Sequence, residues 1–188
     1  MDPNKREIFQ SCHRFLTLHP RLSEKEEISQ ISQNITDQEY ADSYGEGAII
    51  SDFEKEIAKL LGKEAAVFMP SGTMAQQIAM RIWSDKSKSK KIAFHPLSHL
   101  EIHEQQGYKY LHNLEAILLG EQDRLFNLSD LEAINFKIAA LLVELPQREI
   151  GGQLPEFKDL IAFRSWCDSN GCAMHLDGAR LWECTPCL

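Results

Sequence analysis

The chain has 188 residues, enough for one well-buried α/β domain with a short appendage, and its 43% hydrophobic and 26% charged residues are ordinary for a folded protein. Its net charge of −8, from 20 basic and 28 acidic residues, argues against non-specific nucleic-acid binding. No apolar stretch approaches the ~20 residues that cross a bilayer and no signal-peptide pattern is visible, which argues against a membrane partner.

The first 45 residues differ in pattern from the rest, so we expect an N-terminal arm over residues 1–45 and a domain over residues 46–188. Within the arm, Ser23 and Glu26 have the spacing of a capping box. Isoleucines then recur at helical spacing, which predicts an amphipathic helix that packs on the domain or on another subunit. These isoleucines are Ile28, Ile31 and Ile35.

Helical and extended patterns alternate along the following segment. Ser51 and Glu54 predict the cap of a helix that ends at Gly62, and residues 65–69 form a short apolar run typical of a strand. Ser71-Gly72-Thr73 then predicts the start of a second helix. On that helix, apolar side chains form a stripe of Met74, Ile78 and Ile82.

Further apolar runs predict strands over residues 92–94, 108–111, 116–119, 138–145 and 172–176. Helices are expected between them, from about Ser98, from a cap at Ser129 with Glu132, and over residues 156–170 with Gly171 as the stop. This alternation predicts an α/β fold, a three-layer α/β/α sandwich with a mostly parallel, mixed sheet.

Polar groups follow several of the predicted strands, where open α/β sheets bind ligands. The first group is Ser71, Gly72 and Thr73, which stand between a strand and a helix. The glycine allows close approach of the backbone, and N–H groups at a helix N-terminus attract a phosphate. Taken alone, the tripeptide is better interpreted as a simple N-cap.

The second group is Asp177, directly after the last predicted strand, with Arg180 three residues further on. Asp177 can cap a helix, bind a metal or pair with a cationic nitrogen, and in the last role it raises the pKa of a pyridine nitrogen. Arg180 can bind a carboxylate or a phosphate through two hydrogen bonds, or it can form an ordinary salt bridge.

The third group is His99, which can stack flat on an aromatic cofactor ring or form a purely structural hydrogen bond. His99 and His103 also have the i, i+4 spacing of zinc ligands, with Glu104 or His95 as a third ligand. The HExxH signature is absent and Pro96 interrupts the helix on the side of His95, so we expect no metal site.

The cysteines favour a reducing compartment, and we expect a cytoplasmic protein. There are five of them, an odd and scattered number that does not suit a disulfide framework. Cys184 and Cys187 form a C-x-x-C pair, which we interpret as two incidental thiols because no second ligand pair accompanies it.

Together, these motifs resemble the threonine aldolase and β-eliminating lyase family of enzymes, which depend on pyridoxal 5′-phosphate (PLP). The resemblance runs from about Tyr44 to Trp182 and covers most of the chain. It is carried by Tyr44-Gly45-Glu46 with the following helix, Pro70-Ser71-Gly72-Thr73-Met74-Ala75, Ser98-His99-Leu100, Gly151-Gly152-Gln153-Leu154-Pro155, and His175-Leu176-Asp177-Gly178-Ala179-Arg180-Leu181-Trp182.

The resemblance implies the large domain of fold-type-I PLP enzymes, incomplete at its C-terminus, in a homodimer or homotetramer. It implies that Ser71, Gly72 and Thr73 bind the cofactor phosphate. It further implies that His99 stacks on the pyridine ring and that Asp177 pairs with the ring nitrogen, which makes both catalytic. Arg180 then binds the substrate carboxylate.

The implied reaction cleaves a small β-hydroxy amino acid to glycine and an aldehyde through an external aldimine; β-elimination is the alternative. Two departures from the family pattern concern the substrate. Cys12-His13-Arg14-Phe15 stands where the family has Ser-Asp-Thr, and Glu144-Leu145-Pro146-Gln147 replaces the Glu-Asn-Thr-His-Asn of the aldolases.

The family's Schiff-base lysine lies a few tens of residues beyond the motif that contains Asp177, and no lysine of this chain stands in the corresponding place. We therefore expect the sequence to be an N-terminal portion of an enzyme, inactive by itself. The alternative is a non-catalytic scaffold that keeps only cofactor binding or dimerisation.

Overall fold

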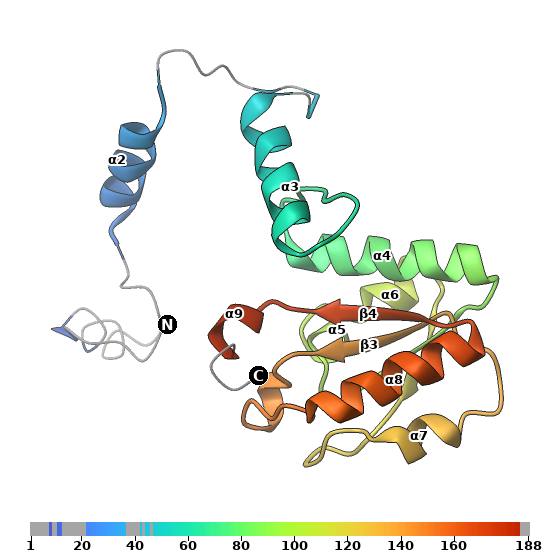
Figure 1. The fold of residues 1–188 in the computed structure, drawn as a ribbon. Helices are drawn as coiled ribbons and strands as arrows, with labels where there is room; N and C mark the ends of the chain where they lie inside the picture. Colours follow the sequence, from blue (N-terminus) through green and yellow to red (C-terminus); the bar gives the residue numbers. More distant parts are fainter. Residues whose placement is uncertain are drawn as a thin grey trace. The chain divides into compact units, whose positions relative to one another are not determined.

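The computed structural model describes residues 8, 11–12, 22–36, 42, 44–45 and 47–184 (Figure 1). It contains two compact units, residues 1–68 and 69–188, and each is described by itself. The predicted boundary at residue 45 stays a prediction. Residues 13–15, Glu46 and Cys187 lie outside the described residues.

In the first unit, helix α2 (Glu24–Asn34) begins as the sequence predicts. The Ser23 hydroxyl accepts a hydrogen bond from the Glu26 N–H at 3.4 Å, and the Glu26 carboxylate accepts one from the Ser23 N–H at 2.8 Å. The predicted capping box is therefore present. The isoleucine side chains of this helix are exposed.

Helix α3 (Ala48–Leu60) begins earlier than predicted, because its N-cap is Gly47 and not Ser51. The Gly47 N–H donates to Asp42 Oδ2 at 2.8 Å, so a carboxylate five residues upstream organises the helix start. Ser51 lies within the helix, and its hydroxyl donates to the Ala48 carbonyl. The helix stops at Gly62 as predicted, where the backbone takes a φ of 59°.

The strand predicted over residues 65–69 is wrong, because this segment is not paired with any strand in the part of the chain that the structure describes. The Phe68 N–H donates instead to Glu54 Oε1 at 2.7 Å. The Phe68 ring packs edge-on against Phe53, with 6.4 Å between the ring centroids. The Glu54 side chain of α3 therefore accepts the backbone hydrogen bond that a neighbouring strand would accept.

The second unit is built on a four-stranded sheet with the order β2-β1-β3-β4, in which every pairing is parallel. The strands are β1 (Lys91–Phe94), β2 (Glu115–Leu118), β3 (Ala140–Glu144) and β4 (Ala173–Asp177). All five residues of β3 are buried, as its continuous apolar run predicts. The register pairs Glu144 with Asp177, so two strands end in carboxylates at the same edge.

Helices cover both faces of this sheet (Figure 1). They are α4 (Gly72–Ser87), α5 (His99–Ile102), α6 (Gly107–Tyr110), α7 (Leu128–Glu132), α8 (Phe157–Asn170) and α9 (Leu181–Cys184), with a 3₁₀ turn over Arg148–Ile150. One core joins Leu141 and Val143 to Phe163 of α8, and another joins Phe94 and Leu142 to Met80 of α4. The predicted three-layer α/β/α sandwich is confirmed.

Two local predictions in this unit are wrong. Residues 108–111 were expected in a strand, but residues 107–110 form helix α6, and the Tyr108 ring packs edge-on against Phe94. Such a short apolar run has no period that separates helix from strand. Helix α7 is capped by Asn127 with Asp130, and not by Ser129 with Glu132.

None of the described helices is both long enough and apolar enough to cross a membrane.

We expect Phe163→Ala to lower the free energy of unfolding by about 3–5 kcal/mol, because the Phe163 side chain is fully buried against the sheet. Phe157 lies on the same helix with 69% exposure, so Phe157→Ala is the matched control and should change stability by about 0.5 kcal/mol or less. Urea denaturation of the two variants checks this. Equal losses would contradict the packing of α8 described above.

Candidate active site

The last residue of β4, Asp177, is a buried carboxylate with two hydrogen-bond donors. Its Oδ2 accepts from Gln76 Nε2 at 2.8 Å, and its Oδ1 accepts from the Ala179 N–H at 3.0 Å. Each carboxylate oxygen accepts about two hydrogen bonds, so Asp177 keeps acceptor capacity for a further donor. It is therefore a fixed acceptor at the carboxyl edge of the sheet.

A second buried carboxylate, Glu144, lies beside it at the end of β3. Its Oε2 accepts from the His99 N–H at 3.1 Å and from Gln147 Nε2 at 3.4 Å. Burial raises the pKa of Glu144 above its usual range, and the charge of Asp177 contributes to the rise. The first turn of α5 is thus attached to the end of the central strand.

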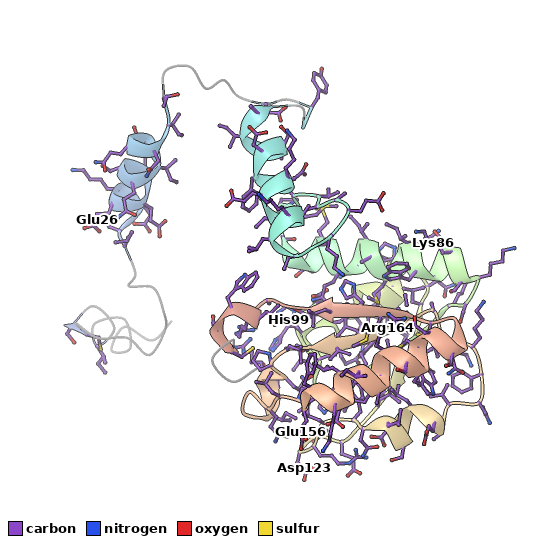
Figure 2. The ribbon with its side chains drawn as sticks, viewed as in Figure 1. Glu26, Lys86, His99, Asp123, Glu156 and Arg164 are labelled. Atoms are coloured by element: carbon purple, nitrogen blue, oxygen red, sulfur yellow. The ribbon has the colours of Figure 1, made fainter. Side chains whose placement is uncertain are left out.

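His99 is the first residue of α5, and Figure 2 places it beside the ends of β3 and β4. Its side chain is 35% exposed, and its Nδ1 lies 3.0 Å from Glu104 Oε1. The neighbouring His103 ring, 5.1 Å away between centroids, is bonded to a different carboxylate, that of Glu149. Among the described residues no group of three ligands could hold a metal ion, and the two histidines do not share a partner.

The tripeptide Ser71, Gly72 and Thr73 forms the start of α4, as predicted. The Ser71 hydroxyl accepts from the Met74 N–H at 3.2 Å, which is the N-cap interaction. The N–H groups of Gly72 and Thr73 have no acceptor among the described residues. A Cβ at Gly72 would have no atom within 4 Å, so the space beside this glycine is open.

Arg180 follows β4 by three residues and is partly buried. It forms no ion pair with any residue that the structure describes. The hydrogen bond from His103 lowers the pKa of Glu149, and the charges of Arg148, His103 and Arg180 contribute to this. Arg180 is therefore a cation whose charge acts on Glu149.

The face that α4 turns toward the sheet was not predicted. Gln76, Met80 and Ser84, spaced by one helical turn, are buried together with Gln77, whereas the apolar stripe is exposed. The exposed stripe consists of Met74, Ile78 and Ile82. The two glutamines contact the site, and the only sequence signal for them was their position opposite an apolar stripe.

Glu104 was considered in the sequence only as a zinc ligand. In the structure its carboxylate contacts His99, Gln76 and Gln77. It therefore belongs to the same cluster as Asp177 although it lies 73 residues before it in the chain. No local pattern identified it, because its partners come from two different helices.

A family model described as beta-eliminating lyase matches residues 27–186. A solved structure assigned as an L-allo-threonine aldolase from Listeria monocytogenes is 50% identical, with a TM-score of 0.86 over 89% of this chain and 47% of that one. A second, assigned as an aromatic amino acid β-eliminating lyase/threonine aldolase from Exiguobacterium sp. 255-15, is 47% identical, with a TM-score of 0.90 over 96% of this chain and 51% of that one.

The low-specificity L-threonine aldolase of Saccharomyces cerevisiae is 27% identical over 147 residues, which are 74% of this chain and 38% of that protein. The chain thus spans about two fifths of the length of such curated relatives.

The raised pKa of Glu144 predicts that the contribution of this carboxyl to stability is lost as the pH rises. Above pH 4.5, the usual pKa of this carboxyl, the unfolded chain releases the proton while the folded protein still holds it, so the free energy of unfolding falls. Glu144→Gln keeps an acceptor oxygen and removes the titration. We expect the variant to gain stability relative to the native protein between pH 4.5 and neutral pH, as measured by urea denaturation.

Glu132→Gln, an exposed position in α7, is the control and should leave the pH dependence unchanged. Parallel pH profiles for Glu144→Gln and the native protein would contradict the assignment of a raised pKa to Glu144.

Proposed function

Because the chain belongs to the β-eliminating lyase family, we propose that it forms the cofactor-binding part of a PLP-dependent amino-acid lyase. The observation that carries the proposal is the buried Asp177 carboxylate, held by two donors at the carboxyl end of β4 with acceptor capacity to spare. The reaction we propose is threonine-aldolase-like, the cleavage of a β-hydroxy amino acid to glycine and an aldehyde.

The donor and acceptor groups of the site fit PLP, which carries a phosphate, a pyridine nitrogen and a conjugated ring. Ser71, Gly72 and Thr73 would hold the phosphate, because two N–H groups at this helix start lack acceptors among the described residues and the space beside Gly72 is open. Asp177 would pair with the ring nitrogen, and the partly exposed ring of His99 would cover the ring face.

When bound, PLP supplies an electron sink that stabilises negative charge on the substrate Cα. Asp177 would keep the pyridine nitrogen protonated, because a buried carboxylate beside a cationic partner raises the pKa of that partner. The donors Gln76 and Ala179 hold that carboxylate in one orientation. The Asp177 carboxylate is thus already oriented before the cofactor binds, so binding requires no reorganisation of this acceptor.

Arg180 would bind the substrate carboxylate. A guanidinium matches a carboxylate through two parallel hydrogen bonds, and Arg180 forms no competing ion pair with the described residues. The charge of Arg180 acts on Glu149, which pairs with His103, the neighbour of His99, so we propose that the substrate carboxylate binds on this side of the site. We propose the homodimer or homotetramer of the family as the working assembly.

A second candidate reaction is β-elimination from a related amino acid. The observation that favours it is Gln147, which stands where the aldolase pattern has a histidine. The Gln147 amide donates to the Leu97 carbonyl at 3.0 Å and is buried, and an amide cannot act as a general base at neutral pH. Any step that the aldolases assign to that histidine needs another group here.

Cofactor binding and turnover of the full-length protein, including any residues beyond Leu188, test the proposal. We expect added PLP to bind, with a visible absorbance band, and Asp177→Asn to lower kcat by about a hundredfold or more while PLP still binds. Asp123→Asn, at an exposed loop position, is the matched control and should leave both unchanged. Absence of PLP binding by the native protein would refute the cofactor assignment.

Incubation with threonine separates the candidate reactions. Glycine with acetaldehyde indicates aldol cleavage, whereas a 2-oxo acid with ammonia indicates β-elimination. A protein that binds PLP and forms neither product pair from any β-hydroxy amino acid is the non-catalytic scaffold.

A further inference from the structure

Glu104 is a fully buried carboxylate that the proposed function does not use. Its side chain has 0% exposure, and no lysine or arginine among the described residues forms an ion pair with it. A buried carboxylate is costly unless several donors surround it. Glu104 lies two residues beyond the end of α5 and is bonded to two side chains of α4.

Two amide N–H donors and one ring nitrogen of His99 converge on Glu104. His99 Nδ1 lies 3.0 Å and Gln76 Nε2 lies 3.3 Å from Oε1, while Gln77 Nε2 lies 3.2 Å from Oε2. A carboxylate oxygen accepts hydrogen bonds, so this pairing requires the His99 nitrogen that faces it to carry the hydrogen. The contact thereby selects Nδ1–H for His99 and restricts the rotation of the ring.

Gln76 connects this pair to Asp177. The same Nε2 that donates to Glu104 donates to Asp177 Oδ2 at 2.8 Å, so the two hydrogens of one amide serve the two carboxylates. Neither Gln76 Oε1 nor Gln77 Oε1 has a partner among the described residues, although both are buried. An unpaired buried acceptor is unfavourable, so the amides are oriented to donate to the carboxylates although their own oxygens are left without donors.

The backbone of α6 leaves room for the third donor. A Cβ at Gly107 would lie 2.4 Å from both Gln77 Nε2 and Gln77 Oε1. Only a glycine at this position allows the Gln77 amide to remain where it reaches Glu104. The surroundings of Glu104 therefore involve three helices: α4 and α5 supply its hydrogen-bond partners, and α6 leaves room for one of them.

We propose that Glu104 and Gln76 are positioning residues for the site. Glu104 fixes the protonated nitrogen and the ring plane of His99, and Gln76 ties this unit to Asp177. His99, assigned to the cofactor ring face, and Asp177, assigned to the ring nitrogen, then belong to one hydrogen-bond network. This inference rests on the roles proposed above for His99 and Asp177.

The first test reads the imidazole itself and needs no cofactor. In protein labelled with ¹⁵N-histidine, at a pH where the ring is neutral, we expect His99 to show a protonated Nδ1. Glu104→Gln should shift the ring to a mixture of tautomers or to Nε2–H, because the charged acceptor is lost. The spectrum of a His99→Gln variant identifies the signal.

Glu101→Gln is the matched control. Glu101 is a carboxylate on α5, the helix of His99, but it accepts hydrogen bonds from Gln106 and Tyr108 and not from His99. Its replacement should leave the His99 tautomer unchanged. If circular dichroism shows that Glu104→Gln does not fold, Glu104→Asp replaces it. The shorter side chain moves the carboxylate away from His99, and we expect the same shift of the His99 tautomer.

The second test measures PLP affinity of the full-length protein. Glu104→Gln and the nearly isosteric Gln76→Met should each weaken PLP binding by about tenfold, the size of one lost hydrogen bond to a charged group. Gln76→Met should leave the His99 tautomer as it is in the native protein, because the contact between His99 and Glu104 remains. This split distinguishes positioning from a general loss of stability.

The outcomes separate this inference from the proposed function. A native protein that binds no PLP refutes the function, while the tautomer measurement still decides whether Glu104 orients His99. A native protein that binds PLP, with unchanged tautomer and affinity in Glu104→Gln, overturns the positioning roles and leaves the function intact.

Discussion

The hydrogen bond from Gln76 Nε2 to Asp177 Oδ2, 2.8 Å long, joins residues 101 positions apart, and the candidate site depends on it. A carboxylate buried at the end of β4 without donors would be strongly destabilising. Helix α4 supplies the donor, which requires a glutamine on the face that packs against the sheet. That requirement accounts for the buried glutamine on this face of α4.

Asp177 is one of three buried carboxylates at this edge of the sheet, and none of them is paired with a lysine or arginine among the described residues. The other two are Glu104 and Glu144. Their donors are amides, a histidine and backbone N–H groups, which hold the carboxylates without cancelling their charge. Such a site favours a bound cation, and a protonated ring nitrogen beside Asp177 is the cation that we propose.

Much of the fold could be predicted from local patterns. The run of residues 138–145 predicted a strand buried on both faces, and Ser71 and Gly171 marked the ends of helices correctly. The failures were segments whose partners are distant. Residues 65–69 have a strand-like composition, but their backbone bonds to Glu54 of α3 instead of a neighbouring strand. Composition carries no information about which neighbour is available.

The sequence by itself determined the α/β class and the family resemblance. It also predicted Gly72, His99, Asp177 and Arg180 as candidate site residues, because these lie in short motifs that follow strands. Only the tertiary structure decided that Gln76 and Glu104 join them. A hydrogen bond depends on two groups that meet within about 3 Å. For the site of this protein, those groups come from α4, α5 and β4, and their meeting is a consequence of how these elements pack.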